Sequence, residues 1–324
     1  MPRISIGILG FNEEYGIGQL LQSFQEQTIF QDQNIVEIIV VSNGSTDKTA
    51  AVAREKLAAL AETVRLKFQV IELPIADKCA AWNHFVHQVS CEADYYILLD
   101  ADVVLVNPNG LAELVGILEK HPECRICGGK IINQRGELLP EIINGKCYAT
   151  RGEILRDVII PEGIISDDAY VAVTIATNWY ETDFDEGLRR GFVRQLENIT
   201  ISCGHTPRDN SFTSYNIAGR KRTIMLAYTQ AQIDYCMRTL FGGGATAREV
   251  AVKLSRKNPK WFLKFLEQSP FQWPPLEPPS LRAWYSPKTI VRYLLYWYAY
   301  LLAVKGIRDR EFGHLAWKLK GRFW

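Results

Sequence analysis

The chain has 324 residues, of which 47% are hydrophobic and 23% charged; this is the composition of a globular protein with a full core and excludes a disordered chain. The length allows one large domain with an appendage, or two domains. A formal net charge of +1 gives no reason to expect a strongly acidic or basic partner.

Strands and helices are expected to alternate in the first third of the chain. Apolar, β-branched runs predict buried parallel strands at residues 3–9, 36–41, 66–73 and 95–99, with helices at 14–27, 48–60 and 77–89. This alternation is typical of βαβ units, so we expect an α/β fold with a mostly parallel central sheet flanked by helices. Right-handed crossovers bring the strand ends to one edge, where the turns at Asn12, Asn43 and Asp100 should converge.

The rest of the chain shows a less regular pattern. A helix is expected at 110–120, a strand at 126–132 and another at 192–202, whereas residues 145–155 are mixed. The polar residues at 166–168 favour a helix that begins there. From about residue 219 helices dominate, with three glycines at 242–244 as a hinge and a proline cluster at 273–279 as an extended linker.

The sequence Asp100-Ala101-Asp102 places two carboxylates at the end of a buried strand. In open α/β sheets this edge is where ligands bind. Two carboxylates so close together repel each other unless a cation lies between them, and Mg²⁺ or Mn²⁺ with substrate phosphates would satisfy this requirement. Taken alone, the motif fits a solvated turn equally well.

Polar residues at two other turns could complete a nucleotide-diphosphate site. Asn43 can pair with a uracil-like or guanine-like base. Lys78, at the start of the third predicted helix, would supply a cation near the phosphates, and Asn83 follows about a turn and a half later. Each of them could instead be a capping residue or a surface group.

Four motifs, taken together, resemble glycosyltransferase family 2, the inverting nucleotide-sugar-dependent transferases. They are Leu9-Gly10-Phe11-Asn12-Glu13-Glu14, Val41-Ser42-Asn43-Gly44-Ser45-Thr46-Asp47, Asp77-Lys78-Cys79-Ala80-Ala81-Trp82-Asn83 and Leu99-Asp100-Ala101-Asp102. Leu9 stands where the family has proline, and Ser42 and Asn43 stand where it has two acids. The order and spacing agree over about the first 105 residues.

The resemblance implies a GT-A fold, Rossmann-like, and a UDP- or GDP-linked sugar as the donor. It implies that Mg²⁺ or Mn²⁺ binds at Asp102 and Asp100, with Asp100 mainly contacting the nucleotide. The nucleotide-sugar-binding residues that it implies are Leu9, Phe11, Asn12, Glu13, Asn43, Lys78, Asn83, Asp100, Ala101, Arg220 and Arg222.

The second half resembles the family more loosely. Residues 148–151 resemble a stretch on the acceptor side, and Ser166-Asp167-Asp168 is similar to Thr-Glu-Asp, whose last Asp is the general base. Asp168 therefore inherits that role, beside Asp167. Arg220 and Arg222 match the arginines of Gln-Arg-x-Arg-Trp and suit a leaving pyrophosphate, but Thr223 replaces the Trp of processive members.

The C-terminal tail differs in charge from the rest of the chain. From residue 281 onward it carries nine Lys or Arg against two acids. The apolar run 290–304, about 23 Å long as a helix, is shorter than a hydrocarbon core of about 30 Å. It suits a helix lying at an anionic membrane surface, although a core helix or a dimer interface would also explain it. The basic residues match no nucleic-acid-binding module, so no nucleic-acid partner is expected.

We therefore expect three segments: a GT-A catalytic domain at 1–222 (donor half 1–105, acceptor half 106–222), helices and linker at 223–280, and a membrane-proximal helical tail at 281–324. The seven cysteines are odd in number and scattered, and no signal peptide is visible, which favours a cytoplasmic protein. Together with the tail, this predicts a protein peripheral at the inner face of the cell membrane. The expected acceptor is a glycan or a lipid-linked molecule.

The predicted function is a metal-dependent, hexosyltransferase-like transfer of a sugar to an acceptor hydroxyl in polysaccharide or glycolipid synthesis. A sugar-phosphate nucleotidyltransferase is one alternative, but it should carry a basic Gly-rich loop where residues 10–14 are acidic. A non-catalytic nucleotide-binding scaffold is the other, and the intact carboxylates at 100, 102 and 168 disfavour it.

Overall fold

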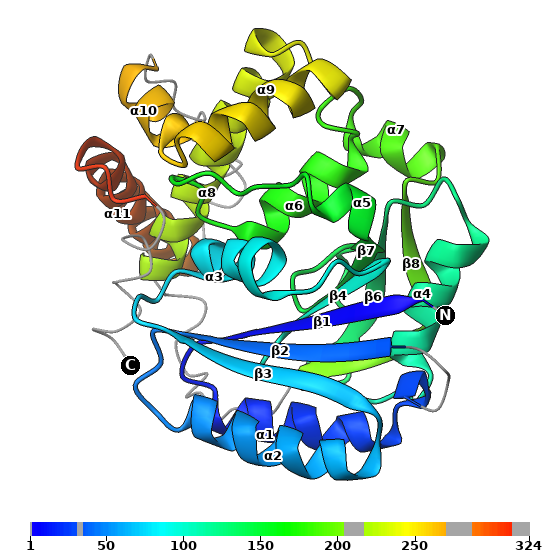
Figure 1. The fold of residues 1–324 in the computed structure, drawn as a ribbon. Helices are drawn as coiled ribbons and strands as arrows, with labels where there is room; N and C mark the ends of the chain where they lie inside the picture. The colour runs from blue at the N-terminus through cyan, green and yellow to red at the C-terminus, as the bar shows by residue number, and fades with distance from the viewer. Residues whose placement is uncertain (1, 31–34, 204–216, 270–286, 313–324) are drawn as a thin grey trace.

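The computed structural model describes residues 2–30, 35–203, 217–269 and 287–312. Within these residues the strands form one mixed sheet in the order β3-β2-β1-β4-β7-β6-β8-β5 (Figure 1). The strands are β1 (Arg3–Gly10), β2 (Ile35–Asn43), β3 (Leu66–Leu73), β4 (Tyr95–Asp100), β5 (Val103–Leu105), β6 (Ile126–Ile132), β7 (Cys147–Arg151) and β8 (Val193–Cys203).

The first half of the sheet is parallel, as predicted. β1 pairs with β2 and β4, and β2 pairs with β3, all in parallel register. The register sets Leu9 beside Val41 on one side and beside Asp100 on the other. The convergence of the three strand ends at one edge is therefore confirmed.

The second half of the sheet is mixed. β7 runs antiparallel to both β4 and β6, while β6 pairs in parallel with β8, and β8 is antiparallel to β5. β7 sets Cys147 opposite Leu99, next to the carboxyl end of β4. A segment that the sequence left unassigned thus lies against the strand that carries the Asp-x-Asp motif.

Helices cover both faces of the sheet. α1 (Glu14–Ser23) and α2 (Thr49–Thr63) lie together on one face, and α3 (Lys78–His84), α5 (Gly152–Leu155) and α6 (Asp167–Ala176) lie on the other (Figure 1). The remaining helices are α4 (Gly110–Lys120), α7 (Phe184–Arg189), α8 (Ile217–Tyr235), α9 (Gly244–Lys257), α10 (Trp261–Gln268) and α11 (Pro287–Arg308). The expected mixed α/β fold with C-terminal helices is confirmed.

The sheet separates two apolar cores. One joins the sheet to α1, α2 and α4, and contains Ile6, Leu57 and Leu114. The other joins it to α3, α6 and the C-terminal helices, and contains Trp82 and Tyr228. The helices after α7 thus complete the core over the face that carries α3 and α6.

The expected division of the chain into three segments remains a proposal. α8 runs continuously through residues 222 and 223, where the catalytic domain was expected to end. The proline cluster at 273–279 and the tail beyond residue 312 lie outside the described residues. In the part of the chain that is described, no helix is long and apolar enough to cross a membrane.

Candidate active site

The turns that follow β1 and β2 brace each other at the carboxyl edge of the sheet. Asn12 adopts a left-handed backbone (φ 53°), and its side-chain oxygen accepts a hydrogen bond from the Thr46 amide at 2.8 Å. The Glu13 amide in turn donates to Thr49 Oγ1 at 2.8 Å. Asn12 and Glu13 therefore fix the shape of this edge.

The other predicted residues of these two turns differ in exposure. Leu9 is buried in the core, while Phe11 is half-buried at the edge. Asn43 is also buried, and the following residue, Gly44, has a φ of 72°. A Cβ on Gly44 would lie 2.4 Å from the Ala76 amide nitrogen, so only glycine fits this turn.

Lys78 joins the Asp-x-Asp motif to the Asp167-Asp168 pair. Its ammonium lies 2.7 Å from Asp100 Oδ1 and 3.5 Å from Asp167 Oδ2. Burial would lower the pKa of Lys78, but the charges of Asp100, Asp167 and Asp168 outweigh burial and raise it well above its ordinary value. Lys78 is therefore a permanent cation between the two acidic motifs.

A second lysine, which the sequence analysis missed, contacts the other carboxylate of the motif. Lys146 Nζ lies 2.8 Å from Asp102 Oδ1 and 3.0 Å from Oδ2. Its backbone oxygen accepts a hydrogen bond from the Asp100 amide. Lys146 could have been predicted only from the antiparallel pairing of β7 with β4, because that pairing brings the first residues of β7 to the carboxyl end of β4.

Asp167 and Asp168 begin α6 and have opposite pKa shifts. Burial is the largest influence on Asp167 and raises its pKa to about 6 against the pull of Lys78. Burial acts the same way on Asp168, but Lys78, a hydrogen bond from Ser166 Oγ, the Ala169 amide and Arg222 outweigh it and lower its pKa. Asp168 is therefore the more acidic member of the pair.

The segment 144–146 brings the two acidic motifs close together. A Cβ on Gly145 would lie 2.7 Å from the Asp168 Cβ, so the backbone at this position packs directly against Asp168. The next residue, Lys146, reaches Asp102. The structure thus gathers Asp100, Asp102, Asp167 and Asp168 around two lysines.

The remaining predicted residues differ in position. Burial is the largest influence on Arg222 of α8 and lowers its pKa, while the charges of Asp168 and Asp167 act to raise it. Arg220, two residues earlier, is half-buried. Asn83 lies at the far end of α3, where its amide exchanges hydrogen bonds with the Ile160 backbone at 2.7 and 3.0 Å. In the structure Asn83 therefore braces the 160 loop.

The Asp-x-Asp carboxylates have the right chemistry for a hard cation. The side chains of Asp100 and Asp102 are 23% and 18% exposed, whereas the Ala101 between them is buried. Within the described ranges no three His, Cys, Asp or Glu side chains come together as a ligand set. The two carboxylates fit Mg²⁺ or Mn²⁺ if substrate phosphates supply the other ligands.

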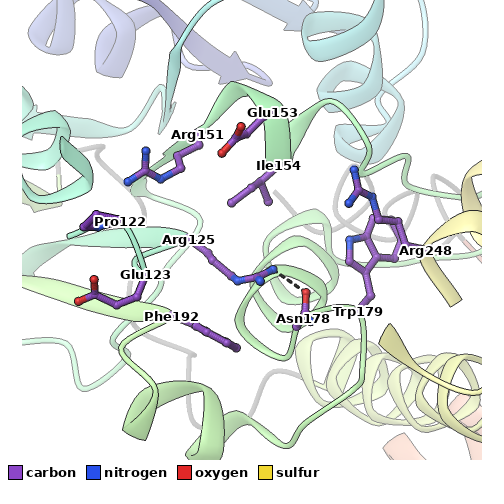
Figure 2. A pocket seen from close by; sticks show the side chains of 10 residues that line it. All are labelled: Pro122, Glu123, Arg125, Arg151, Glu153, Ile154, Asn178, Trp179, Phe192 and Arg248. Atoms are coloured by element: carbon purple, nitrogen blue, oxygen red, sulfur yellow. Dashed lines mark hydrogen bonds between the residues drawn. The ribbon is translucent and has the colours of Figure 1, made fainter. Parts of the chain in front are cut away.

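A separate cavity of about 340 Å³ lies near the opposite edge of the sheet (Figure 2). Its lining includes Arg151, which pairs with Tyr95 at the start of β4, and Arg125, which donates to Asn178. Asn178 begins a run of three left-handed residues after α6. This cavity is remote from the acidic cluster at the carboxyl ends of β1 and β4.

Comparisons with known proteins bear on this arrangement. The family model described as Glycosyl transferase family 2 matches residues 5–158. The mannosyltransferase PcManGT from Pyrobaculum calidifontis, solved in complex with GDP-Man and Mn²⁺, is 17% identical with a TM-score of 0.57, covering 95% of this chain and 88% of that chain. No curated protein sequence matches the chain.

Two other solved structures are similar over different extents. Glucosyl-3-phosphoglycerate synthase from Mycobacterium tuberculosis, in complex with Mn²⁺, UDP and phosphoglyceric acid, is 19% identical, with a TM-score of 0.48 and coverage of 70% of this chain and 78% of that chain. TarS from S. aureus is 13% identical, with a TM-score of 0.49 and coverage of 97% of this chain and 89% of that chain.

The fold places the chain among the GT-A-type α/β proteins, as the similarity to the Pyrobaculum structure shows along nearly the whole chain. Residues 5–158 match the model of glycosyltransferase family 2, which confirms the resemblance inferred from the sequence motifs. Neighbouring structures hold Mn²⁺ or Mg²⁺ together with a nucleotide.

Proposed function

We propose that the chain is an inverting, metal-dependent glycosyltransferase, similar to hexosyltransferases, that moves a sugar from a UDP- or GDP-linked donor to an acceptor hydroxyl. The observation that carries this proposal is the approach of Asp168 to the Asp-x-Asp motif, with Lys78 bridging Asp100 and Asp167. An ionised carboxylate and a cationic diphosphate site at one edge are what an inverting transfer requires.

In this proposal the donor diphosphate lies over the carboxyl ends of β1 and β4. Asp102 and Asp100 would hold Mg²⁺ or Mn²⁺, which neutralises charge on the departing diphosphate when bound. Lys78 and Arg222 supply fixed positive charge beside it. Because these groups are positioned before the substrate arrives, little reorganisation is needed as the leaving group gains charge.

Asp168 is proposed as the base that accepts the proton of the acceptor hydroxyl. Its lowered pKa keeps the carboxylate ionised at neutral pH, and the hydrogen bonds from Ser166 and the Ala169 amide fix its orientation. Asp167 is almost fully buried and pairs with Lys78, so we assign it to orienting Lys78 rather than to accepting the proton.

The nucleotide-contact residues remain proposals. Phe11 and Asn43 lie at the ends of β1 and β2, where a base would bind. The Asn12 side chain, which accepts from the Thr46 amide, and the Glu13 amide, which donates to Thr49 Oγ1, shape that edge. Leu9, which is buried, and Asn83, which is engaged with Ile160, would act by supporting the site. Arg220 would act beside Arg222 on α8.

We also propose that α11 lies on an anionic membrane surface, which would bring the site to a lipid-linked or growing glycan acceptor on the cytoplasmic side. One face of α11 packs along α8 through Ala299, Ala303 and Ile307. The opposite face exposes large apolar side chains at helical spacing, namely Ile290, Val291, Leu294, Trp297, Tyr298 and Leu301. Exposed Lys305 and Arg308 follow at its C-terminal end.

Sedimentation with phosphatidylglycerol-containing vesicles tests the role of α11. The double variant Leu294→Glu/Leu301→Glu should lose binding, whereas Leu240→Glu, which changes an exposed apolar residue on another element, should retain it. Equal sedimentation of both variants would contradict the membrane proposal without affecting the proposed chemistry.

Calorimetric titration with UDP and GDP, with and without Mn²⁺, tests the transferase proposal. Binding that requires Mn²⁺ and is lost in Asp102→Asn is expected, and the preferred nucleotide identifies the donor base. Asp157→Asn, which changes a carboxylate paired with Arg248 outside the site, is the matched control and should bind normally. Failure of the folded wild-type chain to bind either nucleotide would overturn the proposal.

A further inference from the structure

We propose that Lys146 is a built-in counter-ion for Asp102 that makes binding of the divalent metal depend on the donor diphosphate. The proposal rests on the proposed function, since it takes Asp102 as a metal ligand. It assigns a role to a residue outside the sequence motifs, and it predicts that the metal and the donor diphosphate bind cooperatively.

The geometry shows that Lys146 competes for the metal-binding face of Asp102. Its ammonium lies 2.8 and 3.0 Å from the two carboxylate oxygens, so it contacts both of the atoms that a cation would use. The two side chains are only 23% and 18% exposed. A metal ion approaching Asp102 must therefore displace the ammonium or share one carboxylate with it.

The backbone holds Lys146 in this place. The Lys146 amide donates to Asn144 Oδ1 at 3.0 Å, and its carbonyl accepts from the Asp100 amide at 3.3 Å. The preceding Gly145 packs against Asp168, so the segment has little freedom to move away. The base of the Lys146 side chain is thus fixed at the Asp-x-Asp motif, and only its flexible end can move.

Charge then couples the metal to the nucleotide. A metal ion that arrives alone leaves the displaced ammonium close to a dication in a partly buried site, which is unfavourable. A diphosphate brings negatively charged oxygens that can form charge-assisted hydrogen bonds with the Lys146 ammonium while the metal ion binds Asp102. Asp100 is a poor alternative partner for the displaced ammonium, because it already pairs with Lys78 at 2.7 Å.

The proposal predicts a reciprocal effect: metal and nucleotide each strengthen the binding of the other by the same factor. If the ion pair between Lys146 and Asp102 had a structural role alone, the expected result would differ. Loss of the ion pair would then lower the stability of the fold and leave the affinity for the metal ion unchanged or weaker. Metal affinity measured without nucleotide separates the two roles.

The experiment is a titration of the full chain with Mn²⁺ alone, followed by the electron paramagnetic resonance signal of free Mn²⁺. Lys146→Met removes the charge but keeps most of the stem, and Lys146→Arg keeps the charge as the matched control. Lys146→Met should bind Mn²⁺ about tenfold more tightly than wild type, a difference of about 1.4 kcal/mol. Lys146→Arg should resemble wild type.

Nucleotide and a second substitution complete the test. With saturating UDP or GDP, whichever binds, the advantage of Lys146→Met should shrink to less than about threefold, or about 0.7 kcal/mol. Adding Asp102→Asn to Lys146→Met should abolish the tight Mn²⁺ binding. Thermal unfolding verifies that each variant is folded, and Lys146→Gln replaces Lys146→Met if the latter is not.

Equal or weaker Mn²⁺ binding by a folded Lys146→Met or Lys146→Gln would overturn the proposal. So would tight binding that survives the loss of Asp102. Absence of nucleotide binding by wild type would instead refute the proposed transferase function, and the comparison of Mn²⁺ affinities would still stand. The two proposals can therefore fail separately.

Discussion

Asp167 is predicted to destabilise the folded chain at neutral pH, so that Asp167→Asn should be more stable than wild type. The side chain is 6% exposed, and burial raises its pKa to about 6 from an ordinary 3.8. Lys78 opposes this shift, but Asp168 and Asp100 add to it. An amide of the same shape at this position would need no counter-charge.

The magnitude follows from the two pKa values. They differ by about 2 units (6 − 3.8), and at about 1.36 kcal/mol per unit the ionised form costs the fold about 3 kcal/mol. Because the folded state holds the proton of Asp167 more tightly, the contribution of this residue to stability is fully present below about pH 4 and is lost as the pH rises through about 6. The advantage of Asp167→Asn should therefore be near zero at pH 4 and about 3 kcal/mol at pH 8.

Urea unfolding of wild type and Asp167→Asn at pH 4, 6 and 8, in the presence of a chelator, measures this difference. Asp157→Asn is the control, because it removes a carboxylate whose partner is an exposed arginine. It should change stability by less than about 1 kcal/mol. A gain for Asp167→Asn that is the same at pH 4 and pH 8, or a loss at pH 8, would refute the reasoning.

Four further substitutions probe the site and its support. Asp168→Asn should lower kcat/KM by about 10²–10⁴-fold while nucleotide binding persists in calorimetry, and wild-type turnover would exclude Asp168 as the base. Ser166→Ala removes a hydrogen bond that lowers the pKa of Asp168, so the acidic limb of the kcat/KM profile should move to higher pH; an unmoved limb would contradict this. Gly44→Ala should destabilise the fold by more than about 1 kcal/mol in urea, since its φ of 72° and the nearby Ala76 leave no room for a methyl group; unchanged stability would show that the turn relaxes. Trp82→Phe breaks a buried 2.8 Å hydrogen bond to the Tyr148 hydroxyl and should cost about 1–3 kcal/mol, a loss that Tyr148→Phe in the same background should partly restore.

The parallel half of the fold could be predicted because local sequence determines it. Buried parallel strands are continuous apolar runs, and the third of them, Leu66–Leu73, has the predicted bounds. Right-handed crossovers then fix which strand ends meet, so the approach of Asn12, Asn43 and Asp100 followed from chain order alone. The predicted helix start at Ser166-Asp167 was also found; the Ser166 side chain makes no capping hydrogen bond, but Asp167 and Asp168 place two acids in the first turn, which favours a helix N-terminus.

The antiparallel half could not be predicted in the same way. β7 has only five residues, and its pairing with β4 is a contact between segments about 50 residues apart, for which no turn signal exists. Without that pairing, Lys146 looks like an ordinary surface lysine. β5 has three residues, too few to show a period. Asn83 matched a motif by spacing, yet its hydrogen bonds to Ile160 depend on a loop that sequence patterns do not describe.

The balance of charge in the site links the two halves of the molecule. Asp100 ends β4 and Asp102 follows it, while the proposed base Asp168 lies in the first turn of α6. Lys78 on α3 contacts Asp100 and Asp167, the neighbour of that base. Burial raises the pKa of Asp167, and the charges of Asp168 and Asp100 add to this shift although Lys78 opposes it. The site therefore holds excess negative charge before substrate binds, which a dication would relieve. Under the proposed function, the excess negative charge that makes ionised Asp167 unfavourable also favours binding of a metal ion together with the diphosphate at Asp102. The ion pair of Lys146 with Asp102 weakens binding of the metal ion in the absence of the diphosphate.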